Sequence, residues 1–325
     1  MQSATYVELE STRLNPHIDP VLHVWGWEVP VYLFLGGLAA GLLILGAVAV
    51  LSRRQAERPA AMSWMPLLVV PLLALGLGAL FLDLEYKVHV WRFYTTFQPT
   101  APMSWGSWIL LVVFGTAGLS AVRALSEQPW CERLPLGRSR LLHLVADVAR
   151  RHERGLAVTN LVLGIALGIY TGILLSAFSA RPLWNSGLLG LLFLCSGLSS
   201  GAALGALFAR KSADENAFLV RFDLVAIAAE LGLIGLWLLG LATGGEAARE
   251  AAALVLGGPY TAAFWSLVVF VGLVVPLLLE LASLRLAWPT HLVAPVLVLV
   301  GGIALRFILV DAGQVSAVLS SVGAG

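Results

Sequence analysis

Eight stretches of mostly apolar residues alternate with shorter polar segments along the chain. The stretches cover residues 29–51, 65–84, 105–124, 156–178, 185–209, 218–243, 262–284 and 292–313. A helix needs about 20 mostly apolar residues to cross the hydrocarbon core of a bilayer. The run from Leu67 to Leu82 lacks the alternation of apolar and polar residues that marks membrane β-barrel strands. The pattern therefore predicts an all-α polytopic membrane protein with eight transmembrane helices.

The composition agrees with this prediction and excludes several classes of protein. Of the 325 residues, 59% are apolar and only 12% are charged, whereas an average soluble domain carries about 25% charged residues. A soluble globular enzyme, a disordered chain and a nucleic-acid binder with a basic face are all excluded. The net charge of +1 indicates neither an acidic nor a basic partner.

The basic residues predict the orientation of the chain. Thirteen of the 20 Lys and Arg residues lie in the loops after the first, third, fifth and seventh stretches, and five lie on the other side. The positive-inside rule places the richer side in the cytoplasm. With an even number of spans, both termini are then extracytoplasmic. Residues 1–27 have no basic segment followed by an apolar one, so we expect an extracytoplasmic tail and no cleaved signal peptide.

Two other patterns concern the membrane surface. Several tryptophans lie at predicted span ends, where aromatic belts form; they are Trp25, Trp27, Trp64, Trp105, Trp108, Trp184, Trp265 and Trp288. Residues 138–152 carry apolar side chains on one helical stripe with arginines around it. This is typical of an interfacial helix on the cytoplasmic leaflet, which anchors the loop or docks a partner.

Two similar motifs suggest an internal repeat. Gly37–Gly41 reads G-L-A-A-G, and Gly197–Gly201, four spans later in the same direction, reads G-L-S-S-G. A duplicated four-helix unit explains them, and so does chance, because Gly, Ala and Leu are common in all the spans. We expect two four-helix bundles, residues 28–178 and 179–325.

Polar residues near the predicted extracytoplasmic face indicate where chemistry takes place. Glu28, Tyr32, Asp83, Tyr170 and Arg306 stand within spans or at their edges among apolar neighbours, and such groups are costly at this depth. Others share the depth: Glu85, Lys87, His89, Arg92, Asn185, Asp311 and Gln314. A rim of ordinary interfacial groups is one interpretation. We favour a polar-lined pocket near the outer face.

A second polar group lies deeper or nearer the cytoplasm. We expect Arg221 to pair with Asp223 near the inner interface. Glu230, near the middle of its span, is either part of a proton route or a neutral hydrogen-bonded side chain, and Glu280 lies near the inner end of the next span.

The metal ligands of common redox centres are missing from the spans. None of the six histidines lies in the middle of a span, so a haem b held by two axial histidines is not expected. Cys131 and Cys195 lie far apart, whereas an iron–sulfur cluster needs four ligands. If this is a redox protein, its cofactor is diffusible or lies on a partner.

Four segments resemble the membrane subunits of the polysulfide reductase and NrfD family. The first is W-x-W-E-V-P-V-Y-L-F-L-G-G-L-A-A-G, from Trp25 to Gly41. The second, from Leu82 to Trp108, contains the most specific motif, P-T-x-P-M-S-W-G-x-W. The third begins with Y-T-G at Tyr170 and ends at Asn185, and the fourth, L-R-x-x-L-V-x-A-G-Q, runs from Leu305 to Gln314.

The resemblance implies a function. Such subunits lie in the cytoplasmic membrane of bacteria or archaea, contain no haem or iron–sulfur cluster and are not catalytic by themselves. They anchor a ferredoxin-like iron–sulfur subunit and a molybdopterin or nickel–iron catalytic subunit in complexes of anaerobic respiration. They exchange electrons between menaquinone or ubiquinone, bound near the outer face, and the iron–sulfur subunit, which docks on the loop between spans 2 and 3. Proton conduction is a further possible activity.

The resemblance also suggests site residues. Tyr170 matches a tyrosine that the family places near the quinone, whereas Val29 and Tyr32 stand where family members have asparagine and histidine. We hypothesise that Tyr32, Tyr170 and His89 donate hydrogen bonds to the quinone. Glu28 and Asp83 would relay protons, with Arg306 offsetting the charge of one carboxylate; these residues come from the first, second, fourth and eighth spans and the loop between spans 2 and 3.

Two alternative functions remain open from the sequence. A secondary transporter with parallel repeats would bind its substrate near the midplane, and a purely structural anchor would bind no quinone. A transporter would purify alone, whereas the other two would bring partner subunits with them, and bound quinone would then separate those two.

Overall fold

The computed structural model describes residues 25–52, 59–84, 86–98, 100–133, 135–178, 180–209, 212–286 and 292–316. Within these ranges the chain forms helices and no strand. Eight helical segments are long and apolar enough to cross a membrane: Glu28–Leu51, Met62–Asp83, Pro102–Ser126, Glu153–Ser176, Leu188–Phe208, Ala213–Ala242, Thr261–Leu284 and Val293–Val315. The prediction of an all-α protein with eight spans is therefore confirmed.

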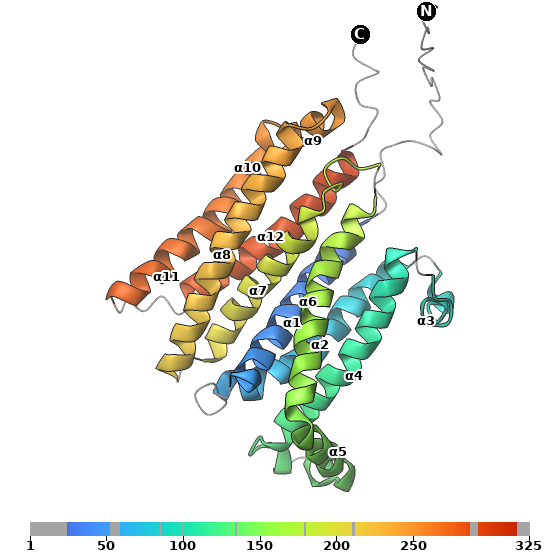
Figure 1. Ribbon diagram of the computed structural model, residues 1–325, viewed down its shortest axis with the longest axis vertical. Helices are drawn as coiled ribbons and strands as arrows, with labels where there is room; N and C mark the ends of the chain where they lie inside the picture. The colour runs from blue at the N-terminus through green and yellow to red at the C-terminus, as the bar shows by residue number, and fades with distance from the viewer. Residues whose placement is uncertain are drawn as a thin grey trace, which may run out of the picture.

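The long helices run side by side in a single bundle (Figure 1). They are α1 (Glu28–Leu51), α2 (Pro59–Asp83), α4 (Pro102–Ser126), α6 (Glu153–Ser176), α7 (Leu188–Phe208), α8 (Ala213–Ala242), α11 (Val275–Leu286) with its preceding segments, and α12 (Val293–Val315). Helix α1 packs against α2, α6 and α7, and α7 packs in turn against α8 and α12. Helices α1 and α7 therefore form the centre. The bundle has a Glu28 end, where α1 begins and α12 ends, and an opposite α5 end.

The two glycine motifs meet at this centre. Gly37 and Gly41 of α1 face Gly197 and Gly201 of α7, and a Cβ atom on Gly201 would lie only 2.8 Å from the Gly41 carbonyl carbon. Small residues at such spacing let two helix backbones come close. The motifs therefore join the two halves of the chain, while duplication of the halves stays a prediction.

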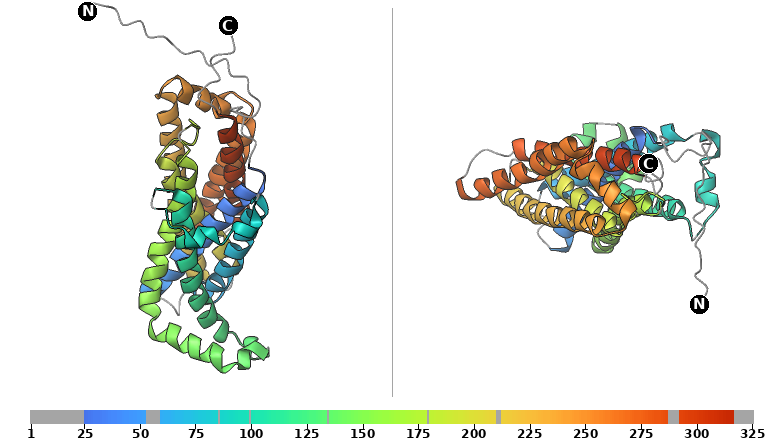
Figure 2. Two further views of the ribbon diagram at one scale, coloured as in Figure 1. Left: turned by 90° about the vertical axis from the view of Figure 1, so that its right-hand side faces the viewer. Right: turned by 90° about the horizontal axis from the view of Figure 1, so that it is seen from above.

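Short elements complete both ends of the bundle. The connection between α2 and α4 contains η1 (Lys87–His89) and α3 (Arg92–Thr95), and α9 (Glu246–Leu256) follows α8, all at the Glu28 end. At the other end lie η2 (Cys131–Arg133), η3 (Pro135–Arg138) and α5 (Arg140–Arg151). Helix α5 lies crosswise to the long helices (Figure 2). The helix predicted over residues 138–152 is thus present.

The seventh span is not a regular α-helix. It begins as α10 (Thr261–Ala263), continues as a π-helical segment, η4 (Phe264–Val274), and ends as α11. Pro276 has no N–H to donate to the Gly272 carbonyl, which favours a local change of hydrogen-bond spacing. Gly272 also packs directly on Gly301 of α12. An apolar pattern does not reveal such a change of helix type.

Candidate functional site

Two buried tyrosines lie near the Glu28 end of the first four spans. Tyr32 of α1 and Tyr170 of α6 are 3% and 7% exposed. The Tyr32 hydroxyl lies within electrostatic range of those of Tyr170 and of Tyr94 in α3. We call these three residues the tyrosine group.

Glycines on two other helices make room for the tyrosine group. Gly76 of α2 lies against the Tyr32 ring, where an added Cβ would be 3.6 Å from Cδ2. Gly106 of α4, within the P-M-S-W-G motif, lies directly against the Tyr170 hydroxyl, which leaves no room for a side chain. The surroundings of the tyrosine group are thus built from four long helices, α1, α2, α4 and α6.

Two predicted carboxylates lie next to the tyrosine group. Glu28 is the first residue of α1 and Asp83 the last of α2, and the two interact electrostatically. Both are half-buried. Glu28 lies one helical turn from Tyr32 on the same face of α1. The carboxylates therefore stand between the buried phenols and the Glu28 end of the bundle.

The other two predicted residues lie elsewhere. His89 is exposed in η1. Arg306 of α12 is fully buried at the junction of α1, α7 and α12, where its guanidinium nitrogen would lie 3.2 Å from a Cβ on Gly37. It donates to the Ser196 hydroxyl and, at 3.2 Å, to the Phe193 carbonyl, and it lies over the Phe193 ring. Its electrostatic partner is Glu230 of α8, not Glu28 or Asp83.

Arg306 belongs to a row of polar side chains that continues toward the α5 end. Glu230 lies within hydrogen-bonding range of Ser196. One turn along α7, Ser199 donates to Asp223 Oδ1 of α8 at 2.5 Å. Asp223 in turn lies within hydrogen-bonding range of Glu280 in α11. The buried polar row comprises Arg306, Ser196, Glu230, Ser199, Asp223 and Glu280.

The buried polar row corrects one prediction and includes two residues that the sequence did not single out. Asp223 is buried and faces Ser199 and Glu280, whereas Arg221 is exposed, so the expected Arg221–Asp223 pair is wrong. Residues two apart on a helix face different directions. The roles of Ser196 and Ser199 were missed, although their spacing of three residues places them on one face of α7.

A cluster at the Glu28 end connects the two halves of the chain. Trp25 and Gln314 exchange hydrogen bonds of 2.9 and 3.0 Å between backbone and amide groups. Trp184 stacks on Trp25 and donates to the Leu309 carbonyl at 2.6 Å. Trp184 is only 2% exposed, so the prediction that it belongs to an interfacial belt is wrong. Trp27, by contrast, is 53% exposed.

The loop arginine Arg181 reinforces this cluster. It donates to the carbonyls of Gln314 and Ser316 at 2.6 and 2.9 Å, and burial lowers the pKa of its guanidinium. These partners are more than 130 residues away in the sequence, so no spacing rule could have revealed the contact.

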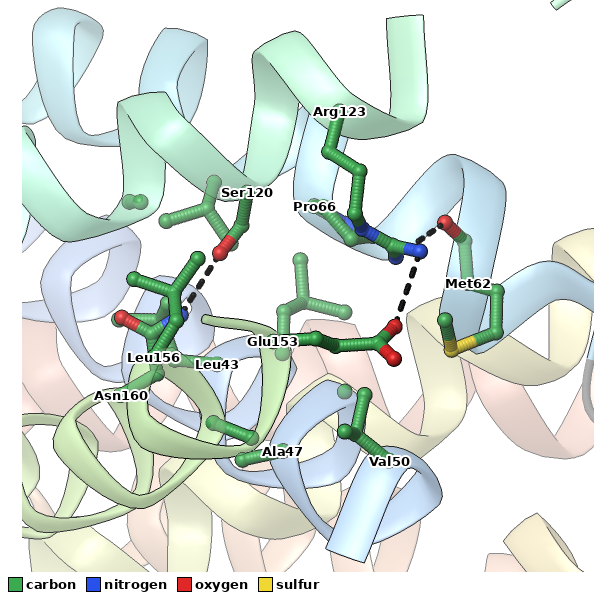
Figure 3. Close-up of a pocket in the computed structure, with 15 residues that line it drawn as sticks. Leu43, Ala47, Val50, Met62, Pro66, Ser120, Arg123, Glu153, Leu156 and Asn160 are labelled. Carbon is green, nitrogen blue, oxygen red and sulfur yellow. Dashed lines mark hydrogen bonds and ion pairs between the residues drawn. The ribbon is translucent and has the colours of Figure 1, made fainter. Parts of the chain in front are cut away.

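A small cavity lies among α1, α2, α4 and α6 near the α5 end (Figure 3). Arg123 bonds to Glu153 at 3.1 Å and to the Met62 carbonyl at 3.3 Å, and Asn160 donates to Ser120 at 2.8 Å. The cavity measures about 40 Å³, and one buried water needs about 10–15 Å³. It has room for a few waters, which would serve the unpartnered Oδ1 of Asn160, and it is too small for a quinone ring.

Metal-ligating side chains do not gather in the part of the chain that the structure describes. No three His, Cys, Asp or Glu residues there are arranged to hold a metal ion. The tyrosine group with Glu28 and Asp83 can instead donate and accept hydrogen bonds and exchange protons.

Comparison with known proteins identifies the family. The sequence matches the family model described as polysulphide reductase, NrfD, over residues 14–318. The chain belongs to the NrfD family. It is thus a multi-pass membrane protein, in agreement with the eight apolar helices and with the resemblance carried by its motifs.

Two of three similar proteins cover nine tenths of this NrfD family protein, and the third covers a smaller part. Protein NrfD of Escherichia coli is 34% identical over 314 residues, which is 90% of this chain and 96% of the relative. A polysulfide reductase chain of Wolinella succinogenes is 32% identical over 307 residues, 90% of this chain and 94% of the relative. A tetrathionate reductase subunit of Salmonella typhimurium is 29% identical over 232 residues, 71% of this chain and 62% of the relative.

Proposed function

We propose that this chain is the quinone-reactive membrane subunit of an anaerobic respiratory oxidoreductase in the cytoplasmic membrane of a bacterium or archaeon. Two similar proteins are named as parts of polysulfide reductase and tetrathionate reductase. The subunit holds no haem and is not catalytic by itself. It anchors a molybdopterin or nickel–iron catalytic subunit through a ferredoxin-like iron–sulfur subunit.

The observation that carries the proposal is the buried tyrosine group beside two carboxylates. A phenol hydroxyl both donates and accepts, so Tyr32 and Tyr170 suit either the carbonyls of a quinone or the hydroxyls of a quinol. Gly76 and Gly106 let the phenol rings of Tyr32 and Tyr170 pack directly against α2 and α4. These residues therefore fit a menaquinone or ubiquinone head group.

The phenols and the residues around them have different roles in the proposed quinol oxidation. A quinol, when bound, supplies two electrons and two protons. Tyr32 and Tyr170 hold and orient the head group, and Glu28 and Asp83 receive its protons and pass them to the Glu28 end. His89, exposed in η1, serves as a donor at the mouth of the site. Arg306 lies deeper in the bundle, where its positive charge offsets the charge of Glu230.

The partner surface lies on the connection between α2 and α4. Tyr86, Val88 and Trp91 are 72%, 83% and 55% exposed there, and exposed apolar groups of this kind mark interaction surfaces. An iron–sulfur subunit docked on this connection would come close to the tyrosine group through Tyr94 of α3.

The buried polar row supplies a route for protons. Its carboxyls come from α8 and α11 and meet serines of α7, and ionisable rows of this type are used as proton relays in membrane proteins. We include proton conduction from the α5 end, taken as cytoplasmic, through Glu280, Asp223 and Glu230, as part of the proposed function.

The test replaces Tyr170→Phe or Asp83→Asn in the assembled complex. Removing a hydrogen-bond partner or a proton acceptor at the reacting group slows turnover about 100-fold or more. Quinol-coupled turnover should fall by that order, whereas turnover of the catalytic subunit with a soluble dye should stay unchanged. Tyr260→Phe, at the same end but outside the tyrosine group, is the matched control.

Unchanged quinol-coupled turnover in both variants would refute the quinone site. The same preparations also test the two alternatives. Purification of the chain alone would favour a transporter, and co-purified subunits without bound quinone would favour a structural anchor.

A further inference from the structure

The turn between α5 and α6 forms an open basic depression at the α5 end. It is lined by Arg150, Arg151, His152, Glu153, Arg154 and Gly155. No atom of the surrounding protein comes within 4 Å of a Cβ built on Gly155, so this glycine leaves the depression open. The first N–H groups of α6 also lie here, and helix starts attract anions.

The acidic neighbours of the depression are already paired, one with Arg123 outside it and one with Arg150 in its lining. Glu153 pairs with Arg123 at 3.1 Å, and Asp147 pairs with Arg150 at 2.7 Å. The hydrogen bond from Arg150 lowers the pKa of the Asp147 carboxyl, so Asp147 stays ionised and holds Arg150 in place. Arg151 lies within electrostatic range of Asp147, but neither Arg151 nor Arg154 forms an ion pair within the described part of the chain, so both guanidinium groups can bind an anion from outside.

An unburied apolar stripe runs along α5 toward the same depression. Leu141, Leu144 and Val148 are 68%, 62% and 46% exposed and follow the spacing of one helix face. The opposite face, with Leu142 and Ala146 buried, is held against the protein, where α5 contacts α4. Val148 lies one turn before Arg151, so the apolar stripe ends where the basic depression begins.

We propose that the α5–α6 turn binds an anionic phospholipid, with the phosphate in the basic depression and the acyl chains along Leu141, Leu144 and Val148. The charge selects an anion, and the adjoining stripe selects an anion with an apolar tail over free phosphate. The crosswise position of α5 (Figure 2) suits a helix that lies in the headgroup region of a leaflet. This site is independent of the quinone chemistry at the other end.

The test measures lipid binding to the detergent-purified complex by native mass spectrometry. Phosphatidylglycerol and phosphatidylcholine with identical acyl chains are titrated separately, and we expect phosphatidylglycerol to bind at least several-fold more tightly. One arginine near a membrane surface contributes about a five-fold change in affinity. Arg151→Ala and Arg154→Ala should each weaken phosphatidylglycerol binding by about that factor. Arg249→Ala on α9, an exposed arginine at the opposite end, should not.

Two further measurements separate the parts of the site. Leu144→Ser should weaken binding of both lipids without changing the preference between them, because it alters only the apolar stripe. Inorganic phosphate should compete only weakly, since it lacks the acyl chains. Quinol-coupled turnover of the same variants should stay normal, which separates failure of this site from failure of the quinone proposal.

Equal binding of the two lipids would overturn the proposal, and so would an equal loss in Arg249→Ala and Arg151→Ala. Competition by inorganic phosphate as strong as that of phosphatidylglycerol would also overturn it, because the ligand would then be a simple anion. Chemical cross-linking of position 144 to a protein subunit in the native membrane would assign this face to a protein partner instead.

Discussion

A completely buried guanidinium needs compensation, and Arg306 shows how this protein provides it. Its two terminal nitrogens donate to the Ser196 hydroxyl and to the carbonyls of Phe193 and Gly302, Nε is left without a hydrogen-bond partner among the described residues, and Glu230 supplies an opposing charge. Removing one member of such a group leaves the other charge buried and unpaired. The members of the buried polar row therefore depend on one another. Its proposed role in proton movement can be tested at the carboxyls nearest the α5 end.

Glu280→Gln should uncouple proton movement from quinol turnover. The amide keeps the shape of the side chain but cannot take up and release a proton, so the route from the α5 end is interrupted. In proteoliposomes that contain the assembled complex, a pH-sensitive dye should report fewer protons moved per electron, while quinol-coupled turnover is retained.

Glu132→Gln is the control for this measurement, because Glu132 is exposed in η2 and outside the buried polar row. A proton count in Glu280→Gln equal to that of the unmodified complex would refute the proposed route while leaving the quinone site intact.

At the scale of elements, the close approach of α1 and α7 decides how the halves fit together. The backbones meet at Gly37, Gly41, Gly197 and Gly201, and this contact places Ser196 and Ser199 against α8 and Tyr32 toward α2. Helices in a membrane associate through packing and hydrogen bonds, since lipid is as apolar as they are. Loss of this packing should therefore lower the stability of the protein directly.

Gly41→Ala should destabilise the protein by about 1–3 kcal/mol, the usual cost of overpacking. The new methyl group would meet the Gly197 carbonyl of α7, which belongs to the backbone and cannot rotate away. Thermal unfolding of the purified complex measures the effect.

Gly78→Ala in α2 is the matched control, because nothing lies within 4 Å of its Cβ position. Its stability should be unchanged, or higher by up to about 1 kcal/mol because alanine favours helix. Equal midpoints for both variants would argue against the observed contact between α1 and α7.

At the scale of the whole molecule, different polar groups gather at the two ends of the bundle, and the buried polar row lies between them. The tyrosine group, its carboxylates and the Trp25–Gln314 cluster lie at the Glu28 end, whereas α5 and the basic depression lie at the other. Basic loops remain on the cytoplasmic side of a membrane, so the α5 end should face the cytoplasm.

Cysteine labelling in intact cells tests this orientation. With Cys131 and Cys195 replaced by alanine, Arg249→Cys should react with a membrane-impermeant maleimide added outside. Arg151→Cys should react only after the cells are permeabilised. Both positions are exposed, so accessibility within the protein does not limit the reaction. The reverse labelling pattern would invert the orientation and place the tyrosine group on the cytoplasmic side.

Much of this organisation could be predicted because it depends on local composition. The eight spans follow from runs of apolar residues that must satisfy their backbone hydrogen bonds within a helix. The helix at residues 138–152 follows from its periodicity. The proximity of Tyr32, Tyr170, Glu28 and Asp83 could be anticipated from equal depth, since polar groups at one level of neighbouring spans tend to meet.

Depth in the membrane did not predict the neighbours of Arg306, Asp223 and Trp184, because depth does not indicate which direction a side chain faces. Arg306 points toward Ser196 and Glu230, Asp223 turns away from Arg221, and Trp184 is enclosed by the halves that it joins. The sequence by itself determined the class of protein, the number of spans and the family. Only the tertiary structure decided which polar groups are partners, because helix rotation and close glycine contacts depend on residues of different helices, such as Gly41 with Gly197 and Arg306 with Ser196.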